Sequence, residues 1–371
     1  LLIAIIALIV PLGLGARAQQ VYEAKRDTSD QFDILFIAAS GDGNRYGAYR
    51  TSNAGSDSKV QERDSAKKII EWALNRARIT VLTKGEYVTG ADYGVTIDED
   101  NVSLIIGPDA TLAGTGDPEY PLMVRVKMAD NVNVFNLGTI DTRNRENGPK
   151  GRAVQYEGHH GKKGASGVRG GIIFGSGRIL NVNAGYWAID AEKMTMPFVW
   201  SEQNMNAPIA MEGVHDMEIG TIAQLALGKG YGEGETIDMN MSCKNIHIEH
   251  VIGMAPNPGD EIVDINNGHY VTVDRLTAFQ GTGYDGALLV GYDLYGHSGM
   301  ESNRPKIRRQ KGHVIKWTER IRKDVANFKR EVSYPGFPGS LPTLRVNASL
   351  VVEFKDGSTR ELLNKKYRFE L

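Results

Sequence analysis

The chain has 371 residues, of which 41% are hydrophobic, and a formal net charge of -2. This length suffices for one large domain or two small ones, and the charge balance is close to neutral over the whole chain. The single cysteine, Cys243, excludes an internal disulfide framework.

Residues 1–18 have the pattern of a secretory signal peptide. Residues 1–10 are almost entirely aliphatic, and Ala16-Arg17-Ala18 offers the small-residue cleavage site that follows such a run. A membrane anchor is the alternative, but the apolar run is shorter than a membrane span requires. We therefore expect a secreted protein, extracellular or periplasmic. An exported chain without disulfides favours the long repetitive core of a solenoid.

Residues 19–78 are predicted to form a strand and a capping helix. The run Ile34–Ala39 indicates an apolar strand, and a loop rich in Gly, Asp, Asn and Ser follows it. From Asp64 to Leu74, apolar residues recur at helical spacing. A helix at this place would cover the open end of a solenoid and its exposed strand edge.

Residues 79–300 are predicted to be strands of a parallel β-helix. Short apolar runs, several of them led by an Asn, recur at residues 79–82, 101–106, 131–135, 179–182, 217–219, 245–248 and 270–273. Their irregular spacing is expected when loops are inserted between the turns of a solenoid. The longest insertions are predicted at residues 141–170 and 184–210, where they would form the walls of a substrate groove.

Residues 301–371 are predicted to be a basic segment followed by a C-terminal cap. Lys and Arg far outnumber acidic residues between Arg304 and Arg330, with a helical pattern from Trp317 to Phe328. The run Leu350–Thr359 has the pattern of a hairpin with an Asp-Gly turn.

Two basic stretches, residues 304–330 and the Gly-rich residues 150–169, stand out from the neutral body of the chain. Basic loops of this kind favour a polyanionic partner, and a solvated surface is the alternative for either stretch alone. For an exported protein we expect an acidic polysaccharide as that partner, with no nucleic acid and no membrane.

Two runs of the chain repeat each other, Glu235-Thr-Ile-Asp238-Met-Asn240 and Glu261-Ile-Val-Asp264-Ile-Asn266. In a parallel β-helix such runs stack about 4.8 Å apart, with Glu over Glu, Asp over Asp and Asn over Asn. Stacked carboxylates repel each other. We therefore expect a bound cation, a shared proton or a substrate to offset this repulsion. The Asn240 and Asn266 pair is expected to form an asparagine ladder that supports the turn.

The chain resembles the pectin-enzyme superfamily of right-handed parallel β-helices, and the polygalacturonase family in particular. The resemblance rests on Gly41-Asp42-Gly43, the helix after Asp64, Leu82–Tyr87, Asn131–Asp141 and Ser242–Ile246. It implies an all-β fold, a right-handed parallel β-helix (solenoid) with an N-terminal capping helix and a C-terminal cap.

The polygalacturonase resemblance also implies catalytic residues. The acidic motifs of the family match Gly234-Glu235-Thr236 and Gly259-Asp260-Glu261. The match implies that Asp260 is the general acid and that Glu235 and Glu261 hold the attacking water. Where the family has a Gly-His-Gly element, this chain has Tyr284-Asp285-Gly286 and lacks the histidine. Asp285 is therefore a further catalytic candidate. Lys316 is the candidate for the family's basic substrate clamp, whose full motif is missing.

A second resemblance is to the polysaccharide lyases of the chondroitinase B and alginate lyase type, through Gly234–Ile237 and Glu261–Val263. It implies that the acidic runs hold Ca²⁺, with Glu235, Glu261, Asp238 and Asp264 as ligands, since hard oxygen ligands suit that ion. The catalytic Lys and Arg of those lyases are missing from their usual places. Candidate bases, which are also candidate substrate-binding residues, are His269, Tyr284, Arg275, His159 and Lys162.

The leading prediction is a secreted, monomeric glycoside hydrolase of an acidic polysaccharide that needs no cofactor. A calcium-dependent polysaccharide lyase and a non-catalytic carbohydrate-binding β-helix are the alternatives. Aromatic residues that could stack on sugar rings are Tyr186, Trp187, Trp200 and Tyr231.

Overall fold

The computed structural model describes residues 32–41, 43–52, 58–90, 93–116, 122–144, 151–158, 167–201, 203–204, 207–224, 236–240, 243–254, 261–266, 269–279, 288–294, 310–316, 343–353 and 359–370. The chain divides into two compact units, Leu1–Phe32 and Asp33–Leu371. The described helix and strands belong to the second unit, apart from Phe32 at the start of the first strand. The predicted signal peptide and the predicted helical stretch Trp317–Phe328 lie outside the described residues.

The described part of the chain begins with three antiparallel strands and a helix. The strands are β1 (Phe32–Ala39), β2 (Tyr46–Tyr49) and β3 (Lys59–Arg63), and the helix is α2 (Ala66–Leu74). Ser65 is the N-cap of α2, and its hydroxyl accepts a hydrogen bond from the Lys68 backbone N–H at 3.4 Å. The apolar face of α2 is buried, as helical spacing predicts. The predicted strand and helix are therefore confirmed.

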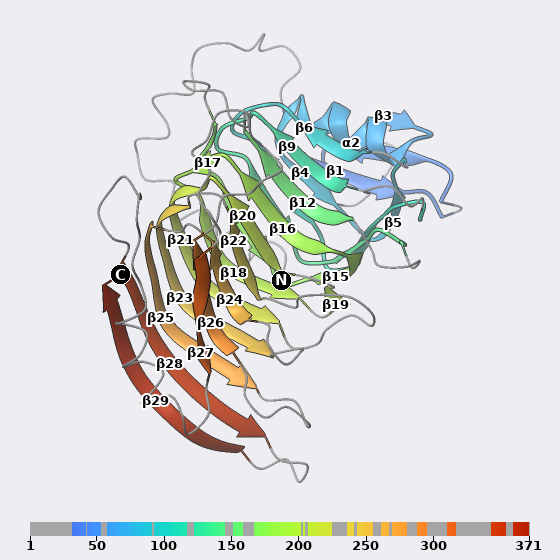
Figure 1. Cartoon of the computed structure of the whole chain (residues 1–371). Coiled ribbons are helices and arrows are strands. Elements are labelled where there is room, and N and C mark those ends of the chain that lie inside the picture. The colour runs from blue at the N-terminus through green and yellow to red at the C-terminus, as the bar shows by residue number, and fades with distance from the viewer. Residues whose placement is uncertain are drawn as a thin grey trace. The chain divides into compact units, whose positions relative to one another are not determined.

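The rest of the described chain is predominantly β, and its strands together with β1, β2 and β3 form three sheets (Figure 1). Sheet A contains β1, β2, β3, β4 (Ala77–Leu82), β7 (Ser103–Ile106), β10 (Asn133–Asn136), β13 (Val168–Arg169), β14 (Ile172–Gly175), β17 (Ala191–Glu192), β18 (Thr195–Ser201), β21 (His215–Gln224), β23 (Lys244–Met254), β25 (His269–Phe279), β28 (Thr343–Glu353) and β29 (Thr359–Glu370). Sheet B contains β5 (Gly85–Val88), β8 (Ala110–Ala113), β11 (Thr139–Asp141), β15 (Arg178–Val182) and β19 (Gln203–Asn204). Sheet C contains β6 (Tyr93–Ile97), β9 (Leu122–Lys127), β12 (Arg152–Glu157), β16 (Ala184–Ile189), β20 (Ile209–Glu212), β22 (Ile237–Asn240), β24 (Glu261–Asn266), β26 (Leu288–Leu294) and β27 (Gln310–Lys316).

The chain visits the three sheets in a fixed order. The strands β7, β8 and β9 lie in sheets A, B and C, and the triplets β10–β11–β12 and β14–β15–β16 follow the same order. Each strand pairs in parallel with the strand at the same place in the next triplet, for example β7 with β10 and β8 with β11. After β20 the described strands alternate between sheets A and C, from β21 to β26.

The inner faces of the sheets bury stacked columns of apolar side chains. In sheet C, Val154, Tyr186, Ile209 and Ile237 lie in register on successive strands, and each is fully buried. Because each such side chain contributes roughly 1.5–3 kcal/mol on leaving water, the columns supply the main driving force for the stack. Tyr186 therefore belongs to the core, and the prediction that it stacks on a sugar ring is wrong.

The places where the chain enters the strands of sheet A share one backbone geometry. A residue with positive φ recurs at the same stacked position of six successive passages, namely Asn101, Asn131, Gly170, Lys193, Asp216 and Asn245. The last two are the second residues of β21 and β23. The amide of Asn131 donates to Asn101 Oδ1 at 3.0 Å, and the amide of Asn245 donates to Asp216 Oδ1 at 2.7 Å. Because Asn and Asp tolerate this left-handed conformation better than other side-chain-bearing residues, the Asn that precedes several of the apolar runs has a structural role.

One predicted insertion is wrong. The sequence predicts a long loop at residues 184–210, but these residues contain β16, β17, β18, β19 and the start of β20 and complete a further turn through all three sheets. The reason is that this segment is apolar on both faces of its strands, as in Ala184–Ile189, so the alternation that marks the other strands is weak. The other predicted insertion, residues 141–170, contains β12 and β13 between stretches outside the described residues.

The predicted C-terminal hairpin is confirmed. β28 and β29 pair antiparallel over their length, and β28 also pairs in parallel with β25. The hairpin thus continues sheet A, and its paired strands satisfy the backbone groups that β25 would otherwise leave open on that side.

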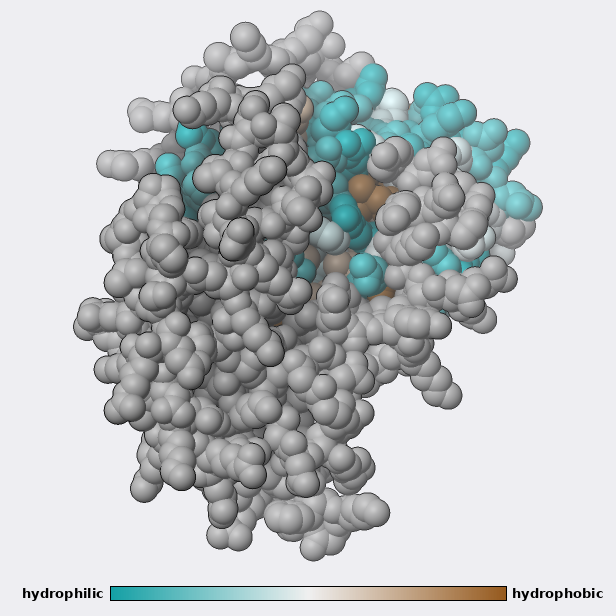
Figure 2. Space-filling model, in the orientation of Figure 1, coloured by the Kyte–Doolittle hydropathy of each residue, from teal (hydrophilic) through white to brown (hydrophobic). Residues whose placement is uncertain are grey.

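On the face seen in Figure 2, the described residues around α2 and β3 are mainly hydrophilic (teal), with a small hydrophobic patch (brown) beside them. Among the residues whose side-chain burial is described, Met128 is the one large hydrophobic residue that is exposed, at 42%. Its backbone has φ 54°, at the turn after β9.

Candidate active site

The outer face of sheet C carries polar side chains. In β22, Ile237 and Met239 are fully buried, whereas Asp238 and Asn240 are partly exposed. Because successive side chains of a strand point to opposite faces of the sheet, Asp238 and Asn240 project from the outer face. Asp238 therefore points outward, as the calcium-site hypothesis requires.

Sheet C places the two repeated runs side by side. Asp238 pairs with Asp264, and the apolar positions on either side of each pair in the same register. Parallel neighbours of this kind are about 4.8 Å apart. The predicted stacking of Asp over Asp is confirmed. Glu261 is the first residue of β24, and Glu235 would precede β22 at the matching position but lies outside the described residues.

Several predicted site residues fall where the structure gives no description. The catalytic candidates Asp260 and Asp285, like Glu235, lie outside the described residues, and so do the substrate-binding candidates Tyr284, His159 and Lys162. For Glu261 and Asp264 the structure defines the strand and the register. Trp200 is likewise placed only by its strand, and Tyr231 lies outside the described residues.

Lys316 lies in the same row of sheet C as Glu261. It is the last residue of β27 and pairs with Leu288, which in turn pairs with Glu261. The two backbones are therefore two strand spacings apart, roughly 10 Å. The other basic candidates, His269 and Arg275, lie in β25 of sheet A. Of the predicted basic residues with a described position, Lys316 alone shares a sheet with Glu261.

The polar groups at the end of β22 are hydrogen bonded within the strand and its turn. Asn240 Nδ2 donates to Asp238 Oδ1 at 2.5 Å, and the Asn240 carbonyl oxygen is 3.2 Å from Cys243 Sγ. The side chain of Asn266 is not described, so the expected Asn240 and Asn266 ladder stays a prediction. A hydrogen bond of that kind joins the side chains of Asn131 and Asn101. Of the proposed calcium ligands only Asp238 has a described side chain, and no group of three or more His, Cys, Asp or Glu among the described residues could hold a metal ion.

Cys243 is predicted to be unreactive in the folded protein. Its side chain is fully buried, and burial raises the pKa of the thiol to about 12. Since the thiolate is the reactive form, a maleimide at about pH 8 should label the native chain far more slowly than the urea-unfolded chain. Mass spectrometry of timed samples measures both rates, and equal rates would contradict the burial of Cys243.

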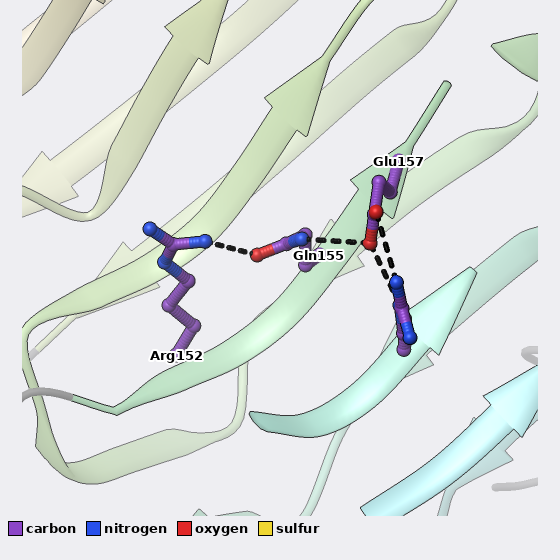
Figure 3. A network of polar contacts seen from close by, with 4 residues as sticks. Arg152, Gln155 and Glu157 are labelled. Atoms are coloured by element: carbon purple, nitrogen blue, oxygen red, sulfur yellow. Dashed lines mark hydrogen bonds and ion pairs between the residues drawn. The ribbon is translucent and has the colours of Figure 1, made fainter. Parts of the chain in front are cut away.

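A polar network lies farther along the same outer face (Figure 3). Arg125 makes a two-pronged ion pair with Glu157, with Nε to Oε2 at 2.7 Å and Nη2 to Oε1 at 2.9 Å. Gln155 Nε2 donates to Glu157 Oε2 at 3.1 Å, and Gln155 Oε1 accepts from Arg152 Nη1. The Arg152 guanidinium also stacks on the ring of Trp187, 3.5 Å from its centre.

The sequence did not reveal this network. Its members come from β9, β12 and β16, which are far apart in the chain, and only the register of sheet C shows that Arg125, Gln155 and Trp187 are direct neighbours. The same row of sheet C continues through Ala210 to Asp238. The network and the paired aspartates therefore lie along one line of the outer face.

The ion pair predicts an acid-dependent loss of stability. The Arg125 guanidinium, by hydrogen bonding to the Glu157 carboxylate, lowers the pKa of Glu157 below its ordinary value of 4.5. A lowered folded-state pKa stabilises the fold above the unfolded-state pKa, and this contribution disappears as the pH falls through the folded-state value. We expect Glu157→Gln to lower the urea midpoint near neutral pH and to have progressively less effect below pH 4.5. A difference that stays constant into strong acid would contradict the ion pair.

Comparison of the chain with protein-family models, with curated proteins and with solved structures finds no match. Within the described residues, no helix has the length and apolar character needed to cross a membrane.

Proposed function

We propose that residues 79–300 form a right-handed parallel β-helix. The support is the repeated passage of the chain through sheets A, B and C, with in-register parallel pairing from one passage to the next. The stacked apolar columns and the repeated left-handed turn residues agree with such a solenoid. On this proposal, α2 covers the first turn of the β-helix and the hairpin of β28 and β29 covers the last.

We propose that the protein is a secreted enzyme that hydrolyses glycosidic bonds of an acidic polysaccharide, with inversion at the anomeric carbon. The observation that carries this proposal is the pairing of Asp238 with Asp264, because it brings the two acidic runs to adjacent strands in register. The same register would set Glu235 beside Glu261, with Asp260 one residue earlier in the chain.

The roles of the carboxylates follow from the chemistry of inversion. One carboxyl must be protonated to donate to the leaving oxygen, and others must hold a water on the opposite face of the sugar, roughly 6.5–9.5 Å away. Asp260 is the proposed acid, and Glu235 and Glu261 are the proposed water-holding groups. Crowding of like charges raises the pKa of one member of such a set, which keeps an acid protonated near neutral pH. Asp285 is a further candidate for this set.

Lys316 is the proposed partner of a substrate carboxylate. It lies in the row of Glu261, two strands away, which suits a cation that binds a sugar adjacent to the one being cleaved. A cationic side chain at this place favours an acidic substrate over a neutral one. On this proposal, the protein acts as a monomer and needs no cofactor for hydrolysis.

A calcium-dependent lyase is the second candidate function. It is favoured by the outward position of Asp238 beside Asp264, since two carboxylates on adjacent strands could share a Ca²⁺ ion. In that reaction the metal would neutralise the uronate carboxylate and a base would remove the α-proton. A carbohydrate-binding β-helix without catalysis is the third.

The test is an assay with two readouts on one panel of substrates. The purified protein is incubated with pectic, alginate, glycosaminoglycan and sulfated algal polysaccharides, while reducing ends and the ultraviolet absorbance of unsaturated uronates are both followed. Hydrolysis predicts new reducing ends, no absorbance, and activity that persists in a chelator. Absorbance that rises in step and is lost in the chelator would show the lyase, and binding without either signal would show a carbohydrate-binding protein.

A further inference from the structure

The strands at the ends of the described sheets differ in charge and length. Sheet A ends at β3 and β29, sheet B at β5 and β19, and sheet C at β6 and β27. Of these strands, β3, β5, β27 and β29 carry charged residues, such as Lys365 and Lys366 of β29, and β19 has only two residues. Charge and short length are the usual means by which an edge strand avoids pairing with another chain. β6 has neither, because Tyr93–Ile97 is five residues long and uncharged.

The edge of β6 is covered by α2 instead. The helix lies beside β6 (Figure 1), and Glu71 Oε1 accepts a hydrogen bond from the Thr96 backbone N–H at 2.9 Å. Among the described strands, β6 pairs only with β9. The N–H of Thr96 is bound by the helix, so it lies on the edge that β9 leaves open. Glu71 thus occupies a donor that a further strand would need for pairing with β6.

The carboxylate of Glu71 is firmly placed at this edge. Burial raises the pKa of Glu71 above its ordinary value of 4.5, while the Thr96 N–H and the charge of Lys67, 4.0 Å away, act against this rise. Ile69 and Ile70 of the same helix are fully buried and hold α2 on the sheets. A strand of another chain would have to break the charge-assisted hydrogen bond and displace α2 before it could pair with β6.

We propose that β6 is a strand-pairing surface for a second copy of this chain, and that Glu71 keeps this surface closed. A second copy fits because two uncharged β6 strands can pair antiparallel without charge repulsion, and because such a two-fold arrangement closes on itself. Glu71 is therefore the residue that keeps the chain monomeric at this edge. The inference concerns association alone and does not rest on the proposed enzymatic activity.

The experiment compares three variants of the full chain. Glu71→Leu deletes the acceptor, Glu71→Gln keeps a neutral acceptor, and Glu249→Leu makes the first substitution at an exposed position of β23, away from α2. Light scattering during size-exclusion chromatography measures the molar mass at low and at high protein concentration. Hydrogen exchange followed by mass spectrometry measures the protection of the β6 peptide in the same samples, and circular dichroism verifies folding.

Wild type and Glu249→Leu are expected to be monomeric at both concentrations, with slow exchange in β6. In dilute Glu71→Leu, exchange in β6 should be about ten- to hundred-fold faster, the effect of losing a charge-assisted hydrogen bond. At high concentration the molar mass of this variant should rise toward that of a dimer. Its β6 exchange should then slow again, because pairing protects the strand. Glu71→Gln should show the same changes to a smaller extent.

Several results would overturn the proposal. Unchanged β6 exchange in folded Glu71→Leu would show that the hydrogen bond does not close the edge. Faster exchange with a monomeric mass at both concentrations would show that β6 does not pair with a second copy. Association that leaves β6 exchange fast, or that Glu249→Leu shows equally, would place the contact elsewhere. If Glu71→Leu does not fold, Glu71→Gln decides, and exchange and mass equal to those of wild type would contradict the proposal.

Discussion

Asp260→Asn is expected to lower kcat on the cleaved polysaccharide by about 10²–10⁴-fold, with a small effect on KM. The expected factor is that of losing a general acid, because asparagine fills the same space but cannot donate a proton to the leaving oxygen. Reducing-end assays over a range of substrate concentrations measure both constants.

The matched control for this variant is Glu249→Gln. Glu249 is exposed on β23 in sheet A, so its neutralisation changes the net charge by the same amount away from the proposed site. Its kcat should equal that of the wild type. Full activity of the Asp260→Asn enzyme would contradict the proposed role of Asp260, whatever the activity of the Glu249→Gln enzyme.

Gly138→Ala is expected to destabilise the fold by about 3 kcal/mol, near the upper end of the usual cost of overpacking. A Cβ atom at Gly138 would lie 2.2 Å from the Gly107 carbonyl oxygen and 2.3 Å from the Ala110 carbonyl oxygen. Both contacts are to backbone atoms, which cannot turn aside as a side chain can. Gly177 packs in turn on Gly138, with its Cβ position 2.2 Å from the Gly138 carbonyl oxygen.

These three glycines form a column at the corner between sheets A and B, where successive turns of the chain approach each other closely. Urea unfolding followed by circular dichroism measures the loss of stability. Gly90→Ala is the matched control, because a Cβ atom at Gly90 meets nothing within 4 Å, and the substitution should be neutral or stabilise by about 0.4–1 kcal/mol. Equal stability of Gly138→Ala and wild type would contradict the close stacking of the turns.

Much of the fold could be predicted because its signals are local. The alternation of Ile237, Asp238 and Met239 predicts a strand with one buried face, and the repeat of this pattern predicts the register with Asp264, which the structure confirms. The helix that begins after Ser65 and the C-terminal hairpin also follow from short-range patterns.

The rest of the fold, and the polar network of sheet C, depend on contacts that short-range sequence patterns do not reveal. Residues 184–210 show little alternation, because β16 is apolar on both faces, so their sequence predicts a loop where the structure has five strands. Trp187 and Tyr186 are neighbours in sequence, yet one side chain meets Arg152 on the outer face while the other fills the core. Arg125 and Glu157 are 32 residues apart in the sequence, and their contact follows only once β9 and β12 are known to pair.

The configuration of the first product tests the proposed chemistry most directly. Proton NMR is recorded during the first minutes of cleavage of the best substrate of the panel, before the new reducing end mutarotates. Inverting hydrolysis predicts that the anomeric proton of the new end has the configuration opposite to that of the cleaved bond. A product with the original configuration would require a covalent intermediate, and an unsaturated uronate would require elimination; either result would contradict the roles proposed for Asp260, Glu235 and Glu261.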